Sequence, residues 1–241
     1  MVTLPRPNAD VQLVVFDLMG TLITDDGVVQ RAYDAALTEA GIAPDTAEAT
    51  AAHAMIKAMR GRPTLVVLTA AIGDAVVAEE ATWAFDDSIL GSVSNLQPID
   101  GSKEVLDELH SQEILTAVTT SFTPEVRKAA LSHMGWTGSF AATLSAQGVR
   151  RGHPAPDLLL QAILDLRVDS VGQVAIVGDN PTDLEAGNRA GAGLIVGVRS
   201  GGAVESELQG APHTHLVDSV ADLPNILESP RDEGQRRRSD R

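Results

Sequence analysis

Short apolar runs alternate with amphipathic helical patterns at the start and over the second half of the chain. Five runs have the length of buried β-strands; they cover residues 12–16, 114–118, 140–144, 174–177 and 194–198. Helical patterns between the later runs begin near Ser102, Thr123, Pro156 and Pro181. Strands that alternate with helices predict a parallel sheet with helices on both faces.

Residues 28–97 interrupt this alternation with a helical pattern and no convincing strand. Four helices are expected here, over residues 28–40, from residue 46 to a Gly-Pro break at 60–63, over 65–72 and over 75–90. Residues 65–68 alone would also suit a short strand, but their helical surroundings favour a helix.

The pattern therefore predicts an α/β fold whose core consists of residues 1–27 and 98–229. Residues 28–97 would form a separate helical insert. Because ligands bind beyond the carboxyl ends of parallel strands, the insert could act as a lid over that edge. Residues 230–241, which include Arg236-Arg237-Arg238, are charged and expected to be disordered.

Composition narrows the possible functions. Of the 241 residues 44% are hydrophobic but only 3% are aromatic, so alanine, valine and leucine must fill the core. The net charge of −15 argues against a general nucleic-acid or anionic-membrane binder, although a metal ion or a few arginines could still attract an anionic substrate. Disulfides and thiolate metal sites are excluded because there is no cysteine. We see no signal peptide in residues 1–12 and no apolar run of about 20 residues, and expect a cytoplasmic protein.

Polar residues follow three of the predicted strands. They are Asp17 with Gly20 and Thr21 after the first strand, Thr119, Thr120 and Ser121 after the second, and Asp179 with Asp183 after the fourth. Carboxylates from different strand ends can bind a hard cation such as Mg²⁺, and an aspartate beside a metal can attack phosphorus. Glycine allows close backbone approach, and hydroxyls at a helix start suit phosphate oxygens.

In this order, the motifs resemble those of the haloacid dehalogenase superfamily of hydrolases. Four regions carry the resemblance: residues 16–21, Thr119 or Thr120, residues 151–157, and residues 178–183. The chain is most similar to the phosphonatase-like branch, the relatives of phosphonoacetaldehyde hydrolase. Residues 119–122, 134–136 and 178–187 carry this closer likeness.

The resemblance implies a Rossmann-like, doubly wound core with an α-helical cap, and Mg²⁺ as cofactor. It implies that Asp17 is both nucleophile and metal ligand. Met19, through its backbone carbonyl, and Asp179 would also bind the metal. Asp183 would bind it through a water molecule or orient the direct ligands, and Thr119 or Thr120 would bind the phosphoryl group.

Two positions separate the chain from well-known members of the superfamily. Met19 stands where phosphatases carry an aspartate that acts as general acid and base, and a thioether cannot transfer protons. Phosphonatases have a small apolar residue there, so Met19 favours that branch over phosphatases and dehalogenases. Thr64 falls at the position of the phosphonatase lysine that forms a Schiff base, while Lys57 is the lysine inside the predicted insert.

The basic groups that would bind the phosphoryl group are also unusual. His153 aligns with a family lysine or arginine and could serve when protonated, while Arg150 or Arg151 could substitute from the same loop. Arg60 and Arg62 flank the Gly-Pro break of the insert, which makes them candidates for substrate contact.

We therefore predict a Mg²⁺-dependent hydrolase that cleaves a small phosphonate or phosphate monoester through an aspartyl-phosphate on Asp17. Two alternatives stay open: dehalogenation of 2-haloacids on the same fold, and a catalytically impaired relative that binds ligands or partners. The expected partner is a small anionic substrate, without nucleic acid or membrane, and both a monomer and a homodimer are possible.

Overall fold

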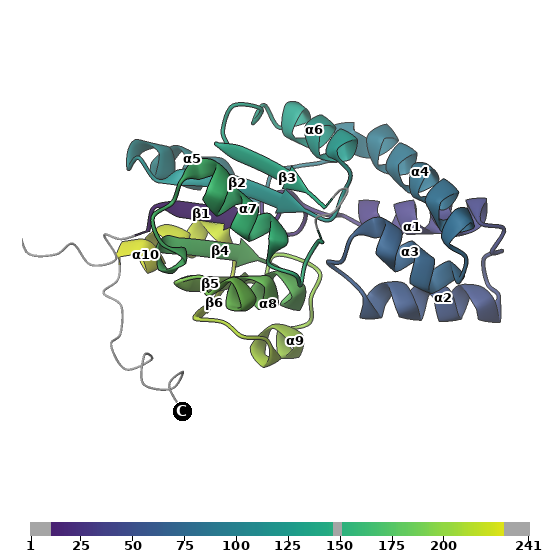
Figure 1. The fold of residues 1–241 in the computed structure, drawn as a ribbon. Coiled ribbons are helices and arrows are strands. Elements are labelled where there is room, and N and C mark those ends of the chain that lie inside the picture. The colour runs from purple at the N-terminus through teal and green to yellow at the C-terminus, as the bar shows by residue number, and fades with distance from the viewer. Residues whose placement is uncertain (1–10, 147–150, 229–241) are drawn as a thin grey trace, which may run out of the picture.

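The computed structural model describes residues 11–146 and 151–228 (Figure 1). The predicted charged tail and Arg150 lie outside these ranges. Within them, parallel strands form one sheet of six in the order β3-β2-β1-β4-β5-β6. The strands are β1 (Leu13–Phe16), β2 (Leu115–Thr120), β3 (Ala142–Ser145), β4 (Val174–Gly178), β5 (Leu194–Val198) and β6 (His215–Val217).

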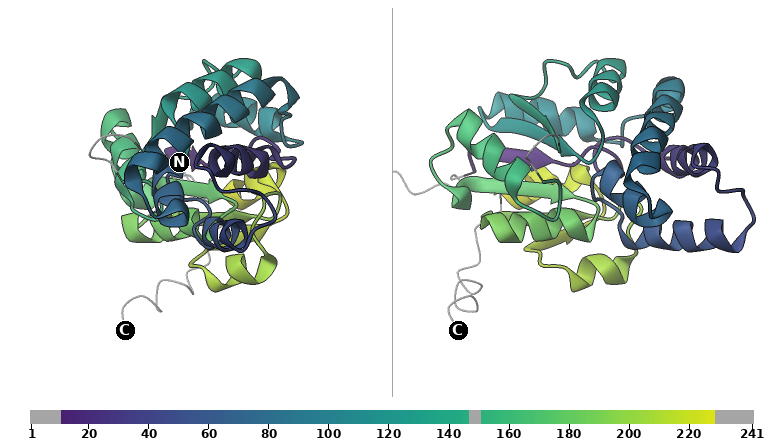
Figure 2. Two further views of the ribbon diagram at one scale, coloured as in Figure 1. Left: turned by 90° about the vertical axis from the view of Figure 1, so that its right-hand side faces the viewer. Right: turned by 45° about the vertical axis from the view of Figure 1, so that its right-hand side comes forward.

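Helices cover both faces of the sheet, as Figures 1 and 2 show. Successive side chains of a strand point to opposite faces, so Val14 and Phe16 of β1 pack in one apolar cluster while Leu13 and Val15 pack in another. On the first face the cluster includes α5 (Ser102–Ser111), α6 (Pro124–His133) and α10 (Leu223–Glu228), and on the second it includes α7 (Asp157–Leu166), α8 (Pro181–Ala190) and α9 (Glu205–Gly210). This confirms the predicted Rossmann-like α/β sheet.

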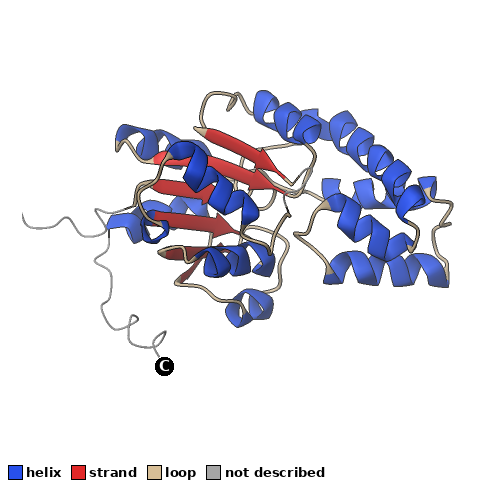
Figure 3. Ribbon diagram, in the orientation of Figure 1, coloured by secondary structure: helices blue, strands red, loops and turns tan. Residues whose placement is uncertain are grey.

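The helical insert lies beyond the carboxyl ends of the strands (Figure 3). It consists of α1 (Val28–Glu39), α2 (Ala47–Ala58), α3 (Thr64–Ile72), α4 (Ala75–Ser92) and a short 3-10 turn (Val93–Asn95). Residues 65–68 are helical, as favoured above. The hydroxyl of Thr46 and the carboxylate of Asp74 accept backbone N–H groups at the starts of α2 and α4, which satisfies groups that a helix leaves free.

The two connections between sheet and insert run side by side. Backbone N–H of Thr24 donates to the Gln97 carbonyl at 2.8 Å, and that of Ile99 donates to the Leu22 carbonyl at 2.9 Å. The predicted boundaries of the insert fall beside these bonds, so a small paired segment joins the two parts. Their division into separate domains stays a prediction.

The sequence patterns missed several details. Strand β2 continues through Thr119 and Thr120, so these threonines belong to the strand itself, and β3 starts and ends slightly later than expected. The short elements α9, β6 and α10 were not predicted, because a strand of 3 residues and helices of 6 residues leave little periodicity to detect. Of the helices in the described ranges, none is both long and apolar enough to cross a bilayer.

Candidate active site

Three carboxylates meet at the carboxyl edge of the sheet. Asp17 directly follows β1, Asp179 directly follows β4, and Asp183 lies in the first turn of α8. Phe16 of β1 pairs with Val177 of β4, so the two strand ends deliver their aspartates to the same place. One oxygen from each carboxylate lies within 4.8 Å of the others. The structure thus brings together the three aspartates that the sequence pointed to.

Neighbouring groups hold two of these carboxylates in place. Asp179 accepts hydrogen bonds from the Asn180 side-chain amide and from the Gly202 backbone N–H, both at 3.0 Å. Asp183 accepts the Asn180 backbone N–H at 3.0 Å, and its other oxygen lies 2.8 Å from Nδ1 of His153. Both carboxylates are therefore oriented before any ligand arrives.

The pKa values of Asp17 and Asp179 are both raised. Burial raises the pKa of Asp17 well above its ordinary value, and the charges of Asp183 and Asp179 raise it further. Burial and then the charge of Asp183 raise the pKa of Asp179 to about 7, while the Gly202 N–H lowers it. A bound cation would relieve this repulsion. Because the available side-chain donors are all oxygens, the cluster fits a hard divalent ion such as Mg²⁺.

Gly20 allows the turn after β1 to approach Asp179. Its φ is 88°, in the left-handed region that favours glycine, and a Cβ at this position would lie 2.5 Å from Oδ2 of Asp179. The Gly20 carbonyl accepts a hydrogen bond from the Ser200 hydroxyl at 2.8 Å. Glycine is therefore required here both for backbone conformation and for space.

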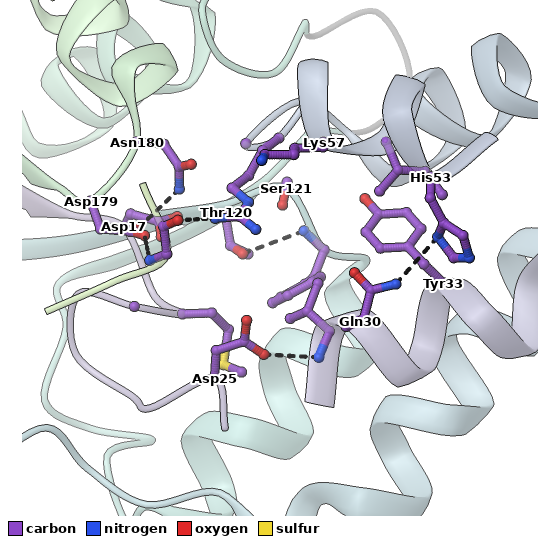
Figure 4. Close-up of a pocket in the computed structure, with 18 residues that line it drawn as sticks. Asp17, Asp25, Gln30, Tyr33, His53, Lys57, Thr120, Ser121, Asp179 and Asn180 are labelled. Atoms are coloured by element: carbon purple, nitrogen blue, oxygen red, sulfur yellow. Dashed lines mark hydrogen bonds between the residues drawn. The ribbon is translucent and has the colours of Figure 1, made fainter. Parts of the chain in front are cut away.

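A cavity of about 270 Å³ lies between the sheet edge and the insert (Figure 4). The core lines it with residues that include Asp17, Met19, Gly20, Thr120, Ser121, Phe122, Asp179, Asn180 and Gly202. The insert and its first connection contribute Asp25, Val29, Gln30, Tyr33, His53, Ile56, Lys57, Arg60 and Gly61. Seven of the residues proposed from sequence thus border one space: Asp17, Met19, Gly20, Arg60, Thr120, Ser121 and Asp179.

The other candidates lie outside this lining. Thr21 and Thr119 are buried, and the Thr119 hydroxyl points to the Phe16 carbonyl at 3.5 Å. Asp183 lies behind the cavity wall, in contact with His153.

Two basic candidates also lie outside the lining. Arg62 does not line the cavity, and the exposed Arg151 donates to Asp157 at 2.8 Å. Of the two residues considered for the Schiff-base position, Lys57 lines the cavity and Thr64 is buried at the start of α3 outside it.

Sequence reasoning missed four polar residues that the insert and its first connection add to the cavity wall: Asp25, Gln30, Tyr33 and His53. They resemble ordinary residues of a loop and of two amphipathic helices. A signal was available for α2, because residues 53, 56, 57 and 60 have the spacing of one helix face. Nothing in the sequence indicated that this face would turn toward the strand ends.

Comparisons with known proteins agree with this geometry. The phosphoglycolate phosphatase of Xylella fastidiosa is 26% identical over 231 residues, which cover 94% of this chain and 95% of that protein. The phosphonoacetaldehyde hydrolase of Bacillus cereus is 28% identical over 144 residues, 57% of this chain and only 53% of that protein. The solved structure of a phosphonoacetaldehyde hydrolase-like protein from Oleispira antarctica superposes with a TM-score of 0.73 at 24% identity, covering 94% of this chain and 95% of that one.

The family model for haloacid dehalogenase-like hydrolases matches residues 11–191. This span begins just before β1 and ends just after α8, so it contains all three carboxylates and the whole insert. We conclude that the chain belongs to the haloacid dehalogenase-like hydrolase family.

Proposed function

We propose that the protein is a Mg²⁺-dependent hydrolase of a small phosphate monoester or phosphonate, with Asp17 as the nucleophile. The observation that carries the proposal is the cluster of Asp17, Asp179 and Asp183, with one oxygen of each within 4.8 Å of the others, beside a cavity that Asp17 and Asp179 line. The names of the two relatives, a phosphoglycolate phosphatase and a phosphonoacetaldehyde hydrolase, support the same class of substrate.

Asp17, Asp179 and the backbone carbonyl of Met19 would hold the metal, with Asp183 close by. A bound Mg²⁺ neutralises charge on phosphoryl oxygens and lowers the repulsion between the substrate and the carboxylates. The carboxylates of Asp179 and Asp183 are already oriented by Asn180, Gly202 and His153.

In the proposed reaction, a carboxylate oxygen of Asp17 attacks phosphorus, the bond from phosphorus to the leaving group breaks, and the leaving group departs with the bonding electrons and takes a proton from water. Water then hydrolyses the aspartyl-phosphate, which releases phosphate and restores Asp17. Thr120 and Ser121 border the cavity at the end of β2, where their hydroxyl or backbone groups can donate to phosphoryl oxygens. The insert would act as a cap that excludes bulk water during these steps.

Two substrate classes remain in the proposal because each has support. The phosphatase relative matches nearly the full chain, which favours a phosphate monoester. Met19, which favours the phosphonatase-like branch, lines the cavity and keeps a phosphonate in consideration.

The test compares the parent with Asp17→Asn on 4-nitrophenyl phosphate, phosphoglycolate and phosphonoacetaldehyde, each with and without Mg²⁺. We expect Mg²⁺-dependent release of phosphate by the parent and a loss of about 10⁴-fold or more in the variant, because the nucleophile is removed. Asp157→Asn, which alters a carboxylate that does not line the cavity, serves as the matched control.

Equal activity of Asp17→Asn and parent would overturn the proposal. Halide release from 2-haloacids without added metal would instead favour a dehalogenase. Phosphate binding by the parent without turnover of any substrate would favour a catalytically impaired protein.

A further inference from the structure

One face of α2 brings basic side chains to the cavity. His53, Lys57 and Arg60 lie three or four positions apart on this helix and its end, and all three line the cavity opposite the aspartates. In the described ranges, Lys57 and Arg60 are the lysine and arginine residues of the lining. The acidic core and the basic helix therefore face each other across one space.

The basic residues of the core do not reach this space. His153 is buried, does not line the cavity and lies 2.8 Å from Asp183 through its Nδ1. The guanidinium of Arg151 is largely exposed and donates to Asp157 at 2.8 Å. The described part of the core thus leaves a phosphoryl group at Asp17 without a nearby arginine or lysine of its own.

Arg60 lies beside the proposed metal site. One of its guanidinium nitrogens donates to the Gly202 carbonyl, and the N–H of the same glycine donates to Oδ2 of Asp179 at 3.0 Å. The charge of Arg60 lowers the pKa of Asp179, which agrees with this proximity. A planar guanidinium with several donors retains free N–H groups for phosphoryl oxygens after binding one carbonyl.

Lys57 lies about one helical turn before Arg60 and points from α2 into the cavity (Figure 4). Within residues 11–146 and 151–228, its ammonium has no hydrogen bond or ion pair, whereas the exposed Lys103 binds Asp107 at 2.7 Å. An unpaired ammonium facing a cavity is available to bind an anion.

We propose that Arg60 and Lys57 bind oxygens of the same phosphoryl group that Asp17 attacks, so that the helical insert supplies the positive charge of the phosphoryl site. The inference rests on the proposed function and adds that the core supplies the nucleophile and the metal ligands, whereas the insert supplies the cations that bind the phosphoryl group. It follows that the phosphoryl site is complete only when the insert packs against the sheet edge. A phosphoryl dianion then favours the closed arrangement, because it contacts both parts.

The test measures binding of inorganic phosphate in the presence of Mg²⁺, by calorimetry and by the shift in Tm that phosphate produces. We expect Arg60→Met to raise the Kd for phosphate by roughly 10- to 100-fold, and Lys57→Met by about 3- to 10-fold, since charged hydrogen bonds are lost. Arg60→Lys should recover part of the affinity. Lys128→Met removes one positive charge from α6, outside the lining, and should bind phosphate as the parent does.

Each result decides the inference. The inference is overturned if Arg60→Met and Lys57→Met both bind phosphate as tightly as the parent. This holds even if their KM rises for phosphoglycolate, because that substrate carries a carboxylate on its leaving group that the two residues could bind instead. If Arg60→Met lowers the Tm without phosphate, the result for Lys57→Met is used to judge the inference. Lys57 has no hydrogen bond to the core in the described ranges, so its replacement should not disturb the fold.

Turnover by the parent, measured in parallel, separates this inference from the proposed function. A parent that hydrolyses phosphate esters while both variants match Lys128→Met refutes the inference alone. A parent that neither binds phosphate nor turns over an ester refutes both.

Discussion

The two walls of the cavity are built in different ways. On the core side, Asp17 and Asp179 follow directly on buried strands, and the carboxylate of Asp179 is held by two hydrogen bonds. On the insert side, Lys57 and Arg60 are long side chains of residues that remain exposed. The hydrogen-bonded carboxylates suit a metal ion with strict geometry, whereas long, exposed cationic side chains suit an anion of variable position.

This contrast predicts that the two walls can be separated by experiment. A substitution in the core should change Mg²⁺ affinity, and one on α2 should change phosphate affinity at saturating Mg²⁺.

Asp179→Asn should have the largest effect. Loss of a charged ligand is expected to raise the Mg²⁺ concentration for half-maximal activity roughly 100-fold. The measurement is a Mg²⁺ titration of activity, with Asp157→Asn as control because Asp157 is bound to Arg151 outside the cavity. An unchanged Mg²⁺ requirement would show that Asp179 does not bind the metal, and the two walls would then not differ in the way described.

Mg²⁺ affinity should also depend on pH. The pKa of Asp179 is about 7 without metal, and Mg²⁺ needs the deprotonated carboxylate. Affinity should therefore fall as the pH drops below 7, by about tenfold per pH unit for each proton displaced. Because this pKa lies above that of the unfolded chain, the metal-free protein should lose stability as pH rises from about 4 to about 7. Calorimetric Mg²⁺ titrations measure how the affinity changes with pH, and thermal unfolding with EDTA measures how the stability of the metal-free protein changes with pH. A Mg²⁺ affinity that does not depend on pH below 7 would contradict the prediction.

His153→Ala should have the smallest effect of the three. Nδ1 of His153 contacts Asp183, so its loss should weaken Mg²⁺ binding by about tenfold through poorer orientation of that carboxylate. Phosphate affinity at saturating Mg²⁺ should stay near that of the parent. The control is His133→Ala, an exposed histidine at the end of α6. A large rise in the Kd for phosphate would instead place His153 in the phosphoryl site, a role that the family resemblance suggested for it.

Much of the fold could be predicted because its signals are local. The strands β1, β4 and β5 are fully buried runs that stand out as apolar, and two helices of the insert, α2 and α4, begin at a side-chain cap. The chain after Val198 was harder, since α9, β6 and α10 are short and β6 is only half-buried. The end of β2 was also mispredicted, because Thr119 and Thr120 are polar residues that complete a buried strand.

The sequence by itself determined the acidic half of the site. A parallel sheet places the carboxyl ends of its strands along one edge, so aspartates after β1 and β4 are expected at that edge; that they lie side by side depends on the pairing of β1 with β4, which the structure shows. The shared edge follows from the order of elements alone, which the hydrophobic pattern provides.

Only the tertiary structure decided which basic residues face those aspartates. Arg60 enters the cavity and Arg62 does not, Arg151 binds Asp157, and His153 contacts Asp183. Arg60 meets Gly202, 142 positions away in the chain. A long side chain takes its position from the packing of segments that are distant in sequence, and no local pattern encodes that packing.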